Sequence, residues 1–175
     1  MDTPSFRPQE PGPDASAFAV GYKAHQGDMM VYGGGALTIF GVVGTIVHAS
    51  PLGFIASAVG TMSAVYFVPT MDVRSPQLGA SQDELFVAKV GVLPWSRVTE
   101  MFVQYRALRT MRLATLIVRT EGKVSEALER SDGTFWGKFS AQNARVSGNI
   151  LKVQLHTLAM APQDVEQRLL ALRGR

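Results

Sequence analysis

The residue types that most often carry chemistry are few and widely spaced in this sequence. The chain contains no cysteine, which excludes disulfides, thiolate metal ligands and cysteine nucleophiles. Its three histidines, His25, His48 and His156, lie far apart, and none stands at metal-ligand spacing to another histidine or to a carboxylate cluster. No nucleophile–base pair or pair of carboxylates can be named either. We therefore expect no enzymatic activity, no metal and no cofactor, and the sequence identifies no small-molecule substrate.

The densest polar cluster is the stretch RALRTMR, which contains Arg106, Arg109 and Arg112. We expect this stretch to form a loop or a short helical turn just before a strand. Three guanidinium groups there can bind anionic lipid headgroups or an acidic protein surface. The alternative is that they are ordinary basic residues on the cytoplasmic side of a membrane protein.

Trp95, which follows Pro94, is a further candidate contact residue. Proline suits an edge strand or the first residue of a strand, because it has no N–H to donate to a ladder. The tryptophan ring beside it can then cover the sheet edge. Two interpretations stay open: Trp95 anchors the sheet, or it is a hot spot for contact with a partner.

The charged residues argue against nucleic-acid binding. The chain holds 17 Lys and Arg against 14 Asp and Glu, which gives a formal net charge of +3. The basic residues are scattered singly, and no dense basic run or helix-turn-helix pattern accompanies them. We expect no nucleic-acid partner.

The elements that must position these residues begin with a long uncharged run. No Asp, Glu, Lys or Arg occurs between Asp28 and Asp72. A single helix over residues 29–71 would be about 64 Å long, roughly twice the hydrocarbon thickness of a bilayer. The run must therefore be interrupted.

The interruption is predicted at the sequence HASPL. Ser50 suits a helix N-cap, and Pro51 suits the first helical position, where a missing N–H costs nothing. We predict a transmembrane helical hairpin over 29–70, with helices at about 29–48 and 51–68. The alternative is a helical hairpin buried in the core of a soluble protein.

Small residues recur on both predicted helices at spacings that allow close helix packing. The candidate packing residues are Gly41 and Gly44, with Gly34 and Thr45, on the first helix, and Ala56, Gly60 and Ala64 on the second. Tyr32 and Tyr66 are expected at the same membrane face, where aromatic residues are common.

The segments on either side of the hairpin differ in composition. Residues 1–28 hold four prolines among polar residues and are expected to form a disordered tail. Residues 71–175 contain patterns typical of strands at 84–90, 97–105, 114–120, 133–141 and 150–158. A C-terminal helix should begin near Pro162 and pack through Val165, Leu169 and Leu172. The predicted fold class is therefore α+β.

The stretch LGASQDELFVAKVGVLPWSRVTEMFV, residues 78–103, resembles the PH-like domains of small bacterial membrane proteins. In that family two strands and a segment of the form I/L-P-W-x-x-I/V follow a pair of transmembrane helices, and here the segment is LPWSRV. The final strand and helix, 150–173, also look like the end of a PH-like barrel. The resemblance covers roughly residues 30–175, with the polar insertion 121–133 as a departure. It implies a transmembrane hairpin followed by a PH-like antiparallel β-barrel or sheet with a C-terminal helix.

These patterns predict a membrane-anchored interaction module. The expected partners are membrane lipids and a larger membrane-protein complex, in which the chain is an accessory subunit or assembly factor. The alternative is an anionic-lipid-binding or membrane-organising protein. Lys23, Arg74 and Arg97 flank the hairpin, while its turn carries no Lys or Arg, so we expect the bacterial inner membrane with both termini in the cytoplasm.

Overall fold

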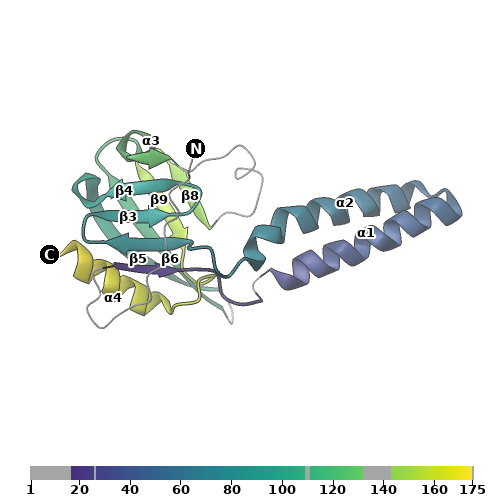
Figure 1. Ribbon diagram of the computed structural model, residues 1–175, viewed down its shortest axis with the longest axis horizontal. Helices are drawn as coiled ribbons and strands as arrows, with labels where there is room; N and C mark the ends of the chain where they lie inside the picture. Colours follow the sequence, from purple (N-terminus) through teal and green to yellow (C-terminus); the bar gives the residue numbers. More distant parts are fainter. Residues whose placement is uncertain (1–16, 26, 109–110, 132–142, 175) are drawn as a thin grey trace.

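The structure is a computed structural model that describes residues 17–25, 27–108, 111–131 and 143–174. A long helical hairpin projects from a β domain (Figure 1). The β domain consists of two antiparallel sheets and a C-terminal helix. The predicted α+β class, with two long apolar helices near the N-terminus and a helix at the C-terminus, is confirmed at this level.

The hairpin consists of α1 (Asp28–His48) and α2 (Pro51–Phe67). Their bounds agree with the prediction to within one residue. A single 3-10 turn, η1 (Val68–Met71), follows α2 and leads the chain back to the β domain. The two helices run antiparallel beside each other over their whole length (Figure 1).

The turn between the helices lies at the predicted position. Ala49 adopts a left-handed backbone with φ of 46°, Ser50 is extended, and Pro51 occupies the first turn of α2. The side chain of Ser50 makes no capping hydrogen bond; its carbonyl oxygen accepts the Gly53 N–H at 3.0 Å. The break is therefore made by backbone conformation and by the proline.

Both sheets of the β domain are antiparallel throughout. Among the described residues, the first sheet contains, in spatial order, β1 (Ala17–Val20), β2 (Leu78–Ser81), β3 (Glu84–Val87), β4 (Gly91–Pro94) and β7 (Arg130–Ser131). The second contains β5 (Val98–Leu108), β6 (Met111–Thr120), β9 (Ile150–Gln154) and β8 (Ala144–Ser147). The short helices η2 (Trp95–Arg97) and α3 (Val124–Ala127) connect strands, and α4 (Pro162–Arg173) follows β9.

Strand β1 corrects the prediction of a disordered tail over residues 1–28 at residues 17–20, and residues 1–16 lie outside the described residues. It pairs with β2 in register, with Val20 opposite Leu78, and both Phe18 and Val20 are buried. The proline-rich composition behind the prediction ends at Pro13, and the apolar AFAV sequence further on is long enough to add one edge strand. The helical hairpin is therefore an insertion between two neighbouring strands of one sheet.

The strands predicted at 84–90, 97–105, 114–120 and 150–158 correspond to β3, β5, β6 and β9. The sequence patterns miss β2, β4 and β8, because glycines such as Gly79 indicate turns. Gly79 instead lies opposite Phe86 within β2, and a Cβ there would lie 3.0 Å from the Phe18 carbonyl oxygen of β1. Close pairing with β1 thus explains this glycine. The strand predicted at 133–141 lies outside the described residues.

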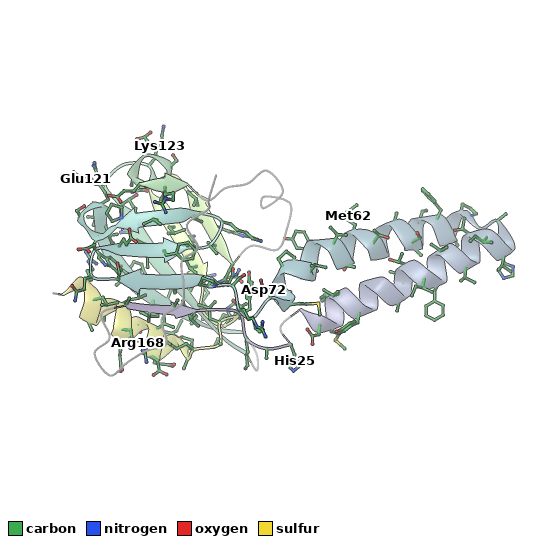
Figure 2. All side chains as sticks on the ribbon, in the orientation of Figure 1. His25, Met62, Asp72, Glu121, Lys123 and Arg168 are labelled. Carbon is green, nitrogen blue, oxygen red and sulfur yellow. The ribbon has the colours of Figure 1, made fainter. Side chains whose placement is uncertain are left out.

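The core of the β domain lies between the sheets and under α4. Its largest fully buried side chains are Leu78, Leu85, Leu93, Leu116, Leu151, Leu155, Leu169, Val87, Val118, Val124, Val153 and Val165. The prediction that α4 packs through Val165, Leu169 and Leu172 is confirmed, since all three are buried. Charged side chains such as Glu121, Lys123 and Arg168 lie on the outside (Figure 2).

Candidate functional site

The two helices of the hairpin meet along a seam of small residues. On α1 these are Gly34, Thr38, Gly41 and Thr45, and on α2 they are Gly53, Ser57, Gly60 and Ala64. Both sets follow the spacing i, i+4, i+7 and i+11, which keeps them on one face of their helix. We call these eight residues the small-residue seam.

At the glycines of the small-residue seam the two main chains approach so closely that no side chain fits at those positions. A Cβ on Gly60 would lie 2.6 Å from both the Gly34 carbonyl oxygen and the Thr38 nitrogen. A Cβ on Gly41 would lie 2.6 Å from the Gly53 carbonyl oxygen and would also collide with the Ser57 backbone. Direct contact between main chains through glycine is the packing mode common in membrane helices.

The predicted packing residues contribute unequally to this contact. Gly41 and Gly60 lie at the closest approach, and Ala64 faces Gly34. A Cβ on Gly44 would meet α2 only at an ordinary distance of 3.8 Å, and Ala56 is half-buried beside the seam.

Thr38, Gly53 and Ser57 belong to the seam but are not among the predicted packing residues. Serine and threonine are small enough to join a glycine seam, and they are easily overlooked when only Gly and Ala are counted. The shared spacing of four, three and four residues on both helices is the signal that identifies them.

Three threonine hydroxyl groups in the hairpin have partners within it. Thr38 donates to the Gly34 carbonyl oxygen at 2.9 Å, and Thr45 donates to that of Gly41 at 2.8 Å. The Thr38 and Thr61 hydroxyl oxygens lie 3.3 Å apart across the two helices. These groups therefore need no hydrogen bonds from water, as an apolar medium requires.

The outward faces of both helices expose large apolar side chains. They include Met29, Tyr32, Ile39, Phe40, Ile46, Val47, Leu52, Phe54, Met62 and Val65. Met62 points away from α1 (Figure 2). By length and composition both helices can cross a membrane. A hairpin buried in the core of a soluble protein would have these side chains covered by the rest of the chain. Here the β domain leaves them exposed.

The base of the hairpin joins the helices to the β domain. Gly27 lies against Thr70, both are buried, and a Cβ on Gly27 would collide with the Thr70 side chain. His25 and Asp28 are hydrogen-bonded at 2.6 Å between Nδ1 and Oδ2. His25 and Asp72 both lie at this junction (Figure 2). The hydrogen bond that Asp72 accepts from the Ser75 hydroxyl, aided by backbone N–H donors, lowers the pKa of its carboxyl.

Three tyrosines also lie near the base. Tyr22 is buried, and the pKa of its hydroxyl is raised, mainly by this burial and to a smaller extent by the nearby Tyr66. Tyr32 and Tyr66 are exposed, and they lie at one level because Gly34 and Ala64, two residues away on each helix, face each other. The shared level agrees with the expectation of two aromatic residues at one end of the hairpin.

Trp95 is held from several sides within the β domain. Its ring N–H donates to the Ser81 carbonyl oxygen at 2.9 Å, and its backbone N–H donates to that of Asp83 at 3.0 Å. Its ring is half-buried and packs against the core. Because Ser81 and Asp83 flank the β2–β3 turn, Trp95 ties that turn to the start of β5. This geometry favours the anchoring interpretation of Trp95.

The arginine cluster lies at the end of the β5–β6 hairpin. Arg106 is exposed in β5 opposite Leu113, and Arg112 lies in β6 opposite Ala107. The expected loop or helical turn is therefore wrong for these two positions, because the strand pairing continues through them. Arg109 and the side chain of Arg112 lie outside the described residues. This end of β5 and β6 lies on the side of the β domain from which the helices project (Figure 1).

In the part of the chain that the structure describes, no group of three or more His, Cys, Asp or Glu side chains is placed to hold a metal ion. No family model matches the chain, and no curated protein or solved structure matches it. The functional assignment therefore depends on the hairpin and on the surfaces around its base.

Proposed function

We propose that the chain is a membrane-anchored, non-catalytic interaction module, an accessory subunit or assembly factor of a larger membrane-protein complex. The observation that carries the proposal is the exposed, uncharged hairpin inserted between two paired strands. Large apolar side chains outside and main-chain contact inside suit an apolar medium, because lipid offers water-excluded packing but no hydrophobic drive between side chains.

The insertion restricts how the hairpin meets a membrane. Val20 at the end of β1 lies opposite Leu78 at the start of β2, so the chain leaves and re-enters the β domain at neighbouring points. Both ends of the hairpin then lie on one side of the bilayer, which two crossings satisfy and one crossing does not. The two spans, α1 and α2 together with η1, have 21 residues each and are about 30 Å long, which matches the hydrocarbon thickness.

The β domain is proposed to be PH-like. Two antiparallel sheets with a packed C-terminal helix agree with the resemblance of residues 78–103 to that family. The strand β1 ahead of the helices is a departure from a domain that wholly follows its transmembrane pair.

We place the hairpin in a bacterial inner membrane with both termini in the cytoplasm. Lys23 and Arg74 lie on either side of the hairpin at its base, whereas its turn at Ala49 and Ser50 has no Lys or Arg. A C-terminal alkaline phosphatase fusion, active only in an oxidising periplasm, should be inactive. Strong phosphatase activity would instead place the C-terminus in the periplasm.

Single cysteines test the two crossings directly, because the native chain has none. Cysteines at Ala49 and at Lys152, which are both exposed, should react with a membrane-impermeant maleimide from opposite sides. Reaction of both from the same side would exclude the two-crossing arrangement.

Purification of the full chain in mild detergent tests the interaction role. We expect a second membrane protein in a fixed molar ratio that survives size-exclusion chromatography. A chain that reaches the membrane but purifies alone from several mild detergents would contradict the role of accessory subunit.

An anionic-lipid-binding or membrane-organising role is the second candidate, and the position of Arg106 favours it. Arg106 is exposed near the end of β5 on the side from which the helices project, where headgroups would lie. Replacing Arg106, Arg109 and Arg112 together by Ala should then reduce co-purified phosphatidylglycerol in a salt-sensitive way. Equal lipid content in the variant and the native chain would remove this candidate.

A further inference from the structure

Among the described residues, β5 is an edge strand whose outer side is unpaired over most of its length. In the described residues its main chain pairs with β6, and its free side is contacted at the start, where Arg173 donates to the Val98 and Thr99 carbonyl oxygens at 3.1 and 2.9 Å. From Glu100 to Leu108, no further main-chain partner is seen among these residues. A long free edge is a template for the addition of another strand.

The pairing register shows which groups of β5 point outward. The Leu155 N–H donates to the Ala114 carbonyl oxygen at 2.9 Å, so Ala114 directs its main-chain groups toward β9. Tyr105 lies opposite Ala114 and must therefore direct its own N–H and C=O away from β6. By alternation, Val103 and Ala107 do the same.

A groove runs between this edge and α4. Its cavity has a volume of about 650 Å³ and is lined by Tyr105, Arg106, Ala107, Ala114, Pro162 and Gln163. The Tyr105 hydroxyl donates to Glu166 at 2.9 Å near one end of α4, and Arg173 reaches Val98 at the other. Helix α4 therefore lies alongside β5 and runs in the opposite direction.

One face of α4 turns toward β5, and its first residues, Pro162 and Gln163, line the cavity. Gln163, Glu166, Leu170 and Arg173 are spaced i, i+3, i+7 and i+10, and so share that face. Leu170 is 52% exposed there, although the neighbouring Leu169 is fully buried in the core. In the described part of the chain, the edge of β5 and this face of α4 thus present main-chain groups without a strand partner, the exposed Leu170 and, beside them on β5, Arg106.

We propose that the β5–α4 groove binds an extended, acidic segment of the membrane partner by strand addition to β5. The site rests on the interaction role proposed above and assigns it a place and a chemistry. Main-chain hydrogen bonds to Val103, Tyr105 and Ala107 supply affinity, as in other strand additions. Among the described residues that line the cavity, Arg106 is the charged one. Glu166 keeps its negative charge on the α4 side of the strand, so an acidic residue of the segment must point to the other side, which Arg106 shares.

The groups at β5 and α4 indicate which side chains the bound segment carries. A carboxylate on the segment pairs with Arg106 on the side of the strand that faces away from α4, because side chains alternate and Tyr105 points to α4. An apolar side chain an odd number of strand positions away, about five, points to the α4 side and covers Leu170. The end of β5 that lines the cavity lies on the side of the β domain from which the helices project (Figure 1), within reach of a tail that emerges from the bilayer beside the hairpin.

Selection of random twelve-residue peptides displayed on phage, against the full chain in lipid nanodiscs, tests the site. Selected peptides should share an acidic residue and an apolar residue. Their affinity should fall about tenfold with Ala107→Pro, which removes an outward N–H, and with Arg106→Glu. The matched control Lys152→Glu lies on the exposed face of the second sheet and should change affinity less than about twofold.

Amide hydrogen exchange distinguishes strand addition from other modes of binding, because only strand addition protects alternate amides of β5. A bound peptide should slow exchange at the amides of Val103, Tyr105 and Ala107, and leave those of Gln104 and Arg106, already bonded to β6, unchanged. Absence of selected peptides, a selection without acidic residues, or native affinity in both variants would overturn the site. If the partner co-purifies equally with Ala107→Pro and the native chain, the interaction role stands and this groove is excluded from it. If no partner co-purifies at all, the interaction role itself fails.

Discussion

The hairpin and the β domain pack by opposite rules. In the β domain, leucine and valine side chains fill the space between the sheets, and charged groups lie outside. In the hairpin, glycines bring two main chains together, and phenylalanine, isoleucine and methionine lie outside. One chain thus contains two packing schemes, each suited to a different surrounding medium.

The difference shows which contribution to the free energy of folding stabilises each region. Burial of apolar surface from water contributes about 25 cal/mol per Å², and this drives the assembly of the β domain. Between helices in lipid that drive is absent, so close main-chain contact and internal hydrogen bonds must replace it. Loss of side-chain volume should therefore harm the β domain, whereas gain of volume should harm the hairpin.

The largest effect is expected from removing volume under α4. Leu169→Ala should lower the free energy of unfolding of the β domain by about 2 to 5 kcal/mol, because Leu169 is fully buried. Leu170→Ala is the matched control and should cost much less, since that side chain is half exposed. Denaturant unfolding of the detergent-solubilised chain, followed by near-UV circular dichroism, measures both. Equal losses in the two variants would mean that α4 does not pack as described.

Adding volume to the small-residue seam should give the next largest effect. Gly41→Leu should separate the helices at a cost of about 1 to 3 kcal/mol, because its side chain meets the α2 main chain. Gly33→Leu adds the same side chain where nothing lies within 4 Å and should be tolerated.

Oxidative cross-linking measures this separation. Cysteines at Thr38 and Thr61, whose hydroxyl oxygens lie 3.3 Å apart, should form a disulfide in the native background and with Gly33→Leu. The yield should fall with Gly41→Leu. An unchanged yield there would contradict the close seam.

A smaller effect is expected from the anchor in the β domain. Trp95→Phe keeps an aromatic ring but removes the hydrogen bond to the Ser81 carbonyl oxygen, and should cost about 1 kcal/mol. Ser96→Ala changes an exposed neighbour and serves as the control. Thermal unfolding compares the two. A variant with native stability that fails to bind the partner would instead make Trp95 a contact residue.

The smallest effect is expected at the junction of the two regions. The pKa of Asp72 is lowered in the folded chain, so its contribution to stability is present at neutral pH and is lost as the pH falls below its ordinary value of 3.8. Asp72→Asn should therefore be slightly less stable than the native chain at pH 7, and the difference should shrink in acid. A difference that grows as the pH falls would contradict this sign.

The sequence predicts the hairpin well because its signals are local. An uncharged run, a serine and a proline suffice to place both helices within one residue. Strand β1 depends on a partner beyond the hairpin, and four residues carry too weak a pattern to reveal it. Interactions between residues distant in sequence decide such elements, and composition does not report them.

For the candidate contact residues, too, the sequence shows the residue types but not the surroundings that the fold gives them. Trp95 stands out in the sequence, but its anchoring role depends on the Ser81 carbonyl, which only the fold brings to it. The cluster at Arg106 is visible as a composition, yet its place at the end of two paired strands follows from the register of β5 and β6. The free edge of β5 has no sequence signal of its own, because it is defined by the absence of a neighbouring strand in the described part of the chain.

The insertion of the hairpin between β1 and β2 also sets an order of folding. As the chain is synthesised, β1 emerges before the hairpin and β2 only after it. Pairing across a flexible segment of that length would carry a loop-closure entropy that grows with the segment. Two antiparallel helices of equal span return the chain to its starting point and remove most of that cost. The first sheet should thus close only after the helices have entered the bilayer, and a chain that fails to insert is left with an unpaired β2 edge that invites aggregation.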